Sequence, residues 1–101
     1  MDERTVAKLN SLELDPQVKI LAARAMKLVE ETTTRQKLKG LDTDWVYRMQ
    51  LKDDIKAVEK CLKQLSKGKL KKQDQLITEL EKDVVKLKTS SEAILGWQFE
   101  D

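Results

Sequence analysis

The most evident candidate for a binding site in this sequence is a cluster of lysines. Between residues 60 and 73 no acidic residue occurs. The lysines of this stretch, together with one lysine upstream, form a candidate basic patch: Lys56, Lys60, Lys63, Lys67, Lys69, Lys71 and Lys72. Such a patch predicts binding to an acidic protein surface, a nucleic-acid backbone or an anionic lipid. No aromatic residue is interleaved, so base stacking is not predicted. The alternative is a solvated outer helix face whose charge favours a helix C-terminus.

Side chains suited to catalysis or metal binding are sparse. The sequence has no histidine and one cysteine, Cys61, which excludes Ser/His and Cys/His catalytic pairs and a structural zinc site. The glycines Gly40, Gly68 and Gly96 stand apart, so no phosphate-binding loop is present. We therefore expect no catalytic residue, no cofactor and no metal, and a protein that is not an enzyme. We expect Cys61 to be a small packed side chain rather than a reactive thiol.

Aromatic residues suggest a second candidate site. Trp45, Val46 and Met49 stand off the apolar stripe of their predicted helix, where they either widen that stripe or form an apolar contact site. Trp97 and Phe99, in "GWQFED", either fold onto the end of the protein or form a short aromatic and acidic peptide for a groove on a partner. We treat these five residues together as a candidate aromatic contact site.

Composition limits the class of protein. A chain of 101 residues is long enough for one domain with a single modest core. The net charge is +2, because 20 Lys and Arg face 18 Asp and Glu, which argues against a dedicated nucleic-acid binder. No membrane span or secretory signal is visible, and one unpaired cysteine fits a reducing compartment. We therefore expect the protein in the cytoplasm or nucleus.

Apolar spacing predicts the elements that position these residues. Residues 1–14 form a weakly helical segment, and long helices follow over about 16–39, 43–66 and 70–95. Asp15 followed by Pro16 is a helix start signal. Together residues 15–96 would form a bundle, with an aromatic and acidic segment at 97–101.

Each long helix has a regular core stripe. The stripes comprise Val18, Leu21, Ala22, Ala25, Leu28, Val29 and Thr32 in the first; Tyr47, Leu51, Ile55, Val58, Leu62 and Leu65 in the second; and Leu70, Gln73, Ile77, Leu80, Val84, Leu87, Ser91 and Ile94 in the third. Gln73 and Ser91 are polar members of the third stripe. They are either surface-exposed or fix the register against a partner helix.

The path of the chain at Gly68, in "LSKGKLKK", has two alternatives. One is a single long helix buried in an intermolecular coiled coil, because a glycine inside a helix costs only about 1 kcal/mol relative to alanine. The other is a turn. The register of Leu51 and Leu65 predicts a core position at Lys69, whereas the next apolar stripe starts at Leu70, and a turn removes this conflict.

The aromatic residues also favour the turn, because folding back at Gly68 brings 45–47 and 97–99 to one end of the molecule. We therefore predict an all-α fold, an antiparallel three-helix bundle (up-down-up) with a short N-terminal helical segment. The alternative is one helix plus one long helix in an intermolecular coiled coil.

These features predict a non-enzymatic protein–protein interaction module, a small helical adaptor or subunit of a larger intracellular assembly. It would contact protein partners through helix faces, as a monomer or dimer. The segments "LDPQVKILAARAMKLVEE" and "KGKLKKQDQLI" resemble the helices of BAG-type Hsp70 co-chaperones. This resemblance implies a three-helix bundle that regulates Hsp70 through charged helix faces. A third hypothesis is electrostatic binding of nucleic acid, membrane or an acidic polymer through the stretch 60–72.

Overall fold

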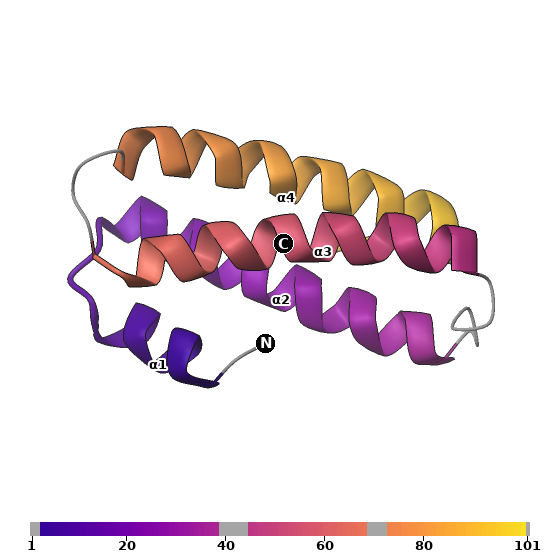
Figure 1. Cartoon of the computed structure of the whole chain (residues 1–101), viewed down its shortest axis with the longest axis horizontal. Helices are drawn as coiled ribbons and strands as arrows, with labels where there is room; N and C mark the ends of the chain where they lie inside the picture. The colour runs from indigo at the N-terminus through magenta and orange to yellow at the C-terminus, as the bar shows by residue number, and fades with distance from the viewer. Residues whose placement is uncertain (1–2, 39–44, 69–72, 101) are drawn as a thin grey trace.

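Four α-helices make up the regular structure of the computed structural model, which describes residues 3–38, 45–68 and 73–100, with 45–50 described by their backbone alone. The helices are α1 (Glu3–Ser11), α2 (Pro16–Leu38), α3 (Trp45–Ser66) and α4 (Gln73–Leu95). The described residues contain no strand, so the predicted all-α class is confirmed. Figure 1 shows α2, α3 and α4 side by side, with successive helices running in opposite directions.

The start of α2 follows the predicted signal. The Asp15 carboxylate accepts a hydrogen bond of 2.9 Å from the backbone N–H of Gln17, and the Asp15 carbonyl accepts the first helical bond from Lys19. Pro16 occupies the first helical position, where a missing N–H leaves no bond unmade. Asp15 is therefore the N-cap of α2.

Gly68 lies just after the end of α3. Its φ is +68°, a left-handed conformation that glycine adopts without a Cβ penalty, and its N–H donates to the Leu65 carbonyl at 3.2 Å. Because α3 ends at Ser66, α4 begins at Gln73 and the two helices pack against each other, they are not one continuous helix. The predicted helix ends at residues 39, 43 and 70 lie outside the described residues.

The core forms where the apolar stripes of α2, α3 and α4 meet. Its largest fully buried side chains include Leu28 of α2, Leu51 and Leu62 of α3, and Leu80 and Leu87 of α4. Burying one such leucine contributes roughly 1.5 to 3 kcal/mol. All five residues were expected in the stripes, so the period of the sequence identified the buried face of each long helix.

The short α1 adds to this core from the side. Leu9 is buried at 3% exposure and Thr5 at 5%, and α1 packs against α3. The 1–14 segment was expected to be weakly helical; within it, Glu3–Ser11 form α1, and Leu9 belongs to the core cluster.

Overall dimensions are modest. The Cα radius of gyration is 13.7 Å and the principal extents are 40, 23 and 22 Å. Within 3–38, 45–68 and 73–100, no helix has the length and apolar character needed to cross a membrane.

Candidate functional site

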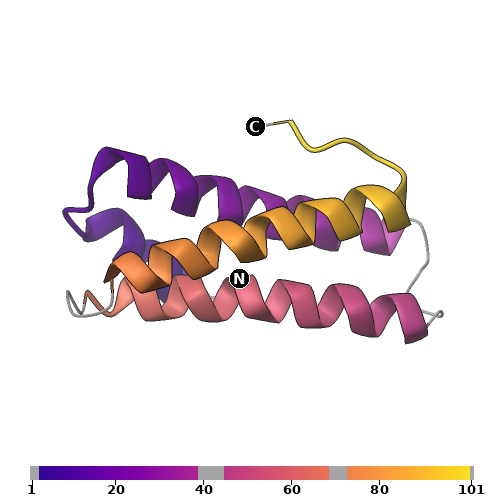
Figure 2. The ribbon, with the colours of Figure 1, turned by 90° about the horizontal axis from the view of Figure 1, so that it is seen from above.

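The C-terminal tail, residues 96–100, doubles back along the helices instead of extending α4. Gly96 has φ +65°, and its N–H donates to the Glu92 carbonyl at 3.0 Å. A glycine in this conformation at the end of a helix reverses the chain direction. Figure 2 shows the tail leaving the end of α4 and running back on the side of α2.

Two aromatic side chains attach the tail to the protein. Phe99 is only 5% exposed and belongs to the core cluster, against which the half-buried Trp97 packs. The two rings meet edge to face, with centroids 5.9 Å apart and an interplanar angle of 87°. Such pairs contribute about 0.5 to 1.5 kcal/mol beyond the area they bury.

Two cations of α2 lie over these rings. The Lys27 ammonium is 5.6 Å from the centroid of Phe99, and the Arg35 guanidinium carbon is 4.3 Å from that of Trp97. Lys27 also donates a hydrogen bond of 3.1 Å to the backbone carbonyl of Glu100. Each cation–π contact at a partly exposed site contributes on the order of 0.5 to 1 kcal/mol. The tail is therefore held by charge as well as by apolar burial.

Contacts from α4 complete the site. The Glu92 carboxylate accepts a hydrogen bond of 2.9 Å from the backbone N–H of Phe99. The indole Nε1 of Trp97, in contrast, is buried without a hydrogen-bond partner. A buried donor left unpaired costs about 1 to 3 kcal/mol, so the missing hydrogen bond of Trp97 weakens the binding of the tail in this position.

The path of the tail differs from the expected aromatic cap. Both rings were expected at the end of the protein near residues 45–47. Trp97 lies against Arg35, close to the end of α2, whereas Phe99 lies beside Lys27, which is in the middle of α2. The reason is the reversal at Gly96, which directs the tail along α2. The predicted contact residues Trp45, Val46 and Met49 lie in α3, and their side chains are outside the described part of the chain.

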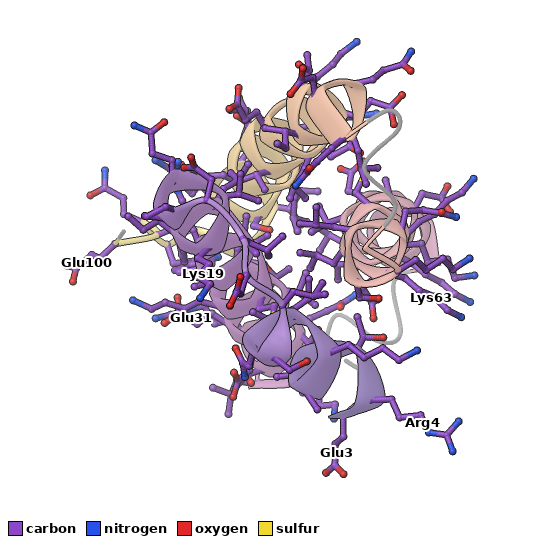
Figure 3. The ribbon with its side chains drawn as sticks, turned by 90° about the vertical axis from the view of Figure 1, so that its left-hand side faces the viewer. Glu3, Arg4, Lys19, Glu31, Lys63 and Glu100 are labelled. Carbon is purple, nitrogen blue, oxygen red and sulfur yellow. The ribbon has the colours of Figure 1, made fainter. Side chains whose placement is uncertain are left out.

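Four lysines of the candidate basic patch lie within the described residues. Lys56, Lys60, Lys63 and Lys67 are all exposed, and none forms an ion pair with a described residue. Figure 3 shows Lys63 pointing outward from α3, on the side of the molecule away from Glu100. The other members of the patch, Lys69, Lys71 and Lys72, lie outside the described residues. Lys63 and the end of the tail at Glu100 therefore lie on opposite sides of the molecule.

Cys61 is buried, and the pKa of its thiol is raised. It is 5% exposed, and its thiol donates a hydrogen bond of 3.3 Å to the carboxylate of Asp83 in α4. Burial first, and then the bond to Asp83 and its negative charge, raise the pKa of the Cys61 thiol from 9.0 to about 12. No group of three potential metal-ligating side chains is found within the described ranges.

Polar residues also lie inside the core. The hydroxyl groups of Thr32 and Ser91 are hydrogen-bonded at 2.9 Å, and both residues are fully buried. Gln73, the other polar residue of the third stripe, is only half-buried. Asp54 of α3 was not expected in the core, yet it is 6% exposed, and one of its carboxylate oxygens lies 3.6 Å from the ammonium nitrogen of Lys86.

The residues that bind the tail were missed from the sequence. Lys27 and Arg35 lie eight positions apart in α2, close to two turns, and this spacing was the only available signal. Glu92 lies near the end of α4, outside the apolar stripe of that helix. The contact of Lys27 with Glu100 spans 73 positions, so no local pattern could predict it.

Comparison of this chain with models of protein families, with curated proteins and with solved structures found no match. The resemblance to BAG-type co-chaperones therefore stays a prediction from the sequence.

Proposed function

We propose that this chain is a non-enzymatic protein–protein interaction module, a small adaptor or subunit of a larger assembly in the cytoplasm or nucleus. Its scaffold would be an antiparallel three-helix bundle of α2, α3 and α4, carrying α1 on one side. The observation that supports this function most directly is the bound tail. The side chains of α2 and α4 hold an extended, aromatic segment, and contacts of this kind are used in peptide recognition.

Exposed aliphatic side chains provide further contact area on the same helices. Ile20 and Leu38 of α2 are 69% and 79% exposed, and Val85 of α4 is 59% exposed. Single exposed aliphatic residues are common on protein surfaces, so they support the proposal only together with the tail. They are also useful probes, because replacing an exposed residue leaves the core intact.

Affinity capture of the full chain from its own cells tests this function. We expect a partner in fixed stoichiometry that remains bound at high salt, because contacts through helix faces depend weakly on ionic strength. The variants Ile20→Asp and Val85→Asp should reduce capture, whereas Lys82→Asp, at an exposed position of α4, is the matched control. Recovery of an Hsp70 nucleotide-binding domain as that partner would support the BAG-type hypothesis. A chain that remains alone at its own mass would contradict the proposal.

A second candidate function is electrostatic binding through the basic patch. It is supported by the exposure of Lys56, Lys60, Lys63 and Lys67 along one side of α3 without ion pairs among the described residues. Binding of a nucleic acid or an anionic vesicle would then fall steeply with salt. Changing these four lysines to glutamine should abolish it, while the same change at Lys19 and Lys82 is the control.

A further inference from the structure

We infer that the face of α2 and α4 beneath the tail is a docking site for an extended segment of another protein. That segment would carry two aromatic side chains separated by one residue and followed by acidic residues. The chain's own tail would occupy the site until such a segment displaces it. This inference rests on the proposed function and adds to it the location of the site, the chemistry of the partner and a means of regulation.

The first argument is the way in which the tail is bound. Beyond the Gly96 N–H, the described tail residues make no backbone–backbone hydrogen bond. The contacts come from side chains of the helices, with Lys27 donating to a tail carbonyl and Glu92 accepting from a tail N–H. A segment of a different protein in the same extended conformation would offer the same carbonyl, N–H and rings. The site therefore recognises features that do not require covalent continuity with α4.

The second argument is that the tail is held incompletely. Trp97 leaves its buried Nε1 donor unpaired. The surface where the tail leaves α4 is a shallow, open depression lined by Thr89, Glu92, Ala93, Gly96, Trp97 and Gln98. Segments with few packed contacts and without regular structure open more readily than the core. Phe99 belongs to the core cluster, but residues 96–100 lack regular structure, so the tail would be the part of this site that leaves while the helices stay folded.

The third argument concerns the chemistry of the partner. Lys27 and Arg35 place two positive charges along α2, each over one ring of the tail. Cations attract the faces of aromatic rings and also carboxylates. An aromatic residue, any residue, a second aromatic residue and then acidic residues is therefore the pattern that this face favours. The tail shows that pattern in "WQFED".

A labelled peptide with the sequence of residues 95–101, LGWQFED, tests the inference by fluorescence polarisation. In the full chain, the double variant Trp97→Ala/Phe99→Ala removes both rings and frees the site. We expect this variant to bind the peptide at least tenfold more tightly than the unmodified chain, because the intramolecular tail competes at a high effective concentration. Gln98→Ala changes an exposed tail residue between the rings and should behave like the unmodified chain.

A second pair of changes locates the site. Lys27→Glu, introduced into the double variant, should weaken peptide binding at least fivefold. Lys63→Glu makes the same charge change on the opposite side of the molecule and should have little effect (Figure 3). Equal effects of the two changes would overturn the inference, because the peptide would then bind elsewhere or by net charge alone.

Circular dichroism shows whether the double variant keeps its helices. Should it lose them, Gly96→Val provides a second route, because a β-branched residue disfavours φ +65° and opens the tail with both rings present. Loss of helix in both variants would overturn the inference, since the tail would then be part of the folding core. The same conclusion follows if the peptide binds neither variant, or binds the unmodified chain equally well.

A measurement of molecular mass tests the remaining alternative, that the tail of a second copy of this chain occupies the site. Dimers of the unmodified chain that disappear in Trp97→Ala/Phe99→Ala would overturn the inference in favour of exchange of tails between two copies. A failure of the peptide test leaves affinity capture of the full chain unaffected, since a partner could still bind another helix face. The two proposals can therefore fail separately.

Discussion

The hydroxyl oxygens of Thr32 and Ser91 lie 2.9 Å apart at fully buried positions of α2 and α4. Each hydroxyl is the hydrogen-bond partner of the other. Because a buried hydroxyl without a partner is costly, this pair favours the register of α2 and α4 that brings the two groups together.

Removing either hydroxyl of this pair should destabilise the protein, and the two losses should not be additive. We expect Thr32→Val or Ser91→Ala to lower the free energy of unfolding by about 1 to 3 kcal/mol, since each leaves the other group unpaired. The double variant should lose clearly less than the sum of the two. Urea unfolding measures all three, and Thr78→Val, at an exposed position where the hydroxyl bonds within α4, is the control. Strictly additive losses would show that the pair is not coupled.

Gly68 should resist replacement because of its backbone conformation. At φ +68° a Cβ would approach the Leu12 Cδ2 at 3.5 Å, an ordinary contact, so the cost arises from the left-handed conformation itself. We expect Gly68→Ala to lower the free energy of unfolding by about 1 to 2 kcal/mol. Gly68→Asn should cost less, because asparagine tolerates this region better. Stabilisation by alanine in urea unfolding would indicate a continuous helix instead.

Cys61 should react slowly with thiol reagents in the folded protein. At pH 8 its thiol stays protonated, because burial and the neighbouring Asp83 raise its pKa to about 12. Ellman's reagent should therefore modify Cys61 much faster in urea than in buffer. Rapid reaction of the native protein at pH 8 would contradict the buried position.

The same pKa has a consequence for stability. Because the folded thiol titrates near 12 and the unfolded thiol near 9.0, the unfolded state releases its proton first as the pH rises. The contribution of Cys61 to stability is thus fully present below pH 9 and is lost between pH 9 and pH 12. Cys61→Ser should flatten this part of a plot of unfolding free energy against pH. An unchanged slope would argue against the raised pKa.

Solution size distinguishes the packed helices from an extended coiled coil. A monomer with the present arrangement has a Cα radius of gyration of 13.7 Å and a longest extent of 40 Å. A helix continuous from about residue 44 to 95 would be roughly 78 Å long at 1.5 Å per residue. We expect small-angle scattering to give the compact particle with the mass of one chain. A particle about 80 Å long would contradict the observed packing of α3 against α4.

The sequence by itself determined the local structure of this protein. Asp15 and Pro16 specified the start of α2, and the spacing of apolar residues such as Leu28, Leu62 and Leu87 specified which side of each long helix is buried. These features depend on residues within one or two turns of each other, where the helical period and the capping groups act directly. The exposure of the lysines on α3 followed from the same period.

Only the tertiary structure decided which distant residues meet. The reversal at Gly96 places Phe99 beside Lys27 and Trp97 beside Arg35, and packing of α3 on α4 brings Cys61 to Asp83. No local pattern encodes these pairs, because each depends on how helices pack and where the chain turns. For the same reason, Phe99 lies along the side of α2 and not at the expected end of the molecule.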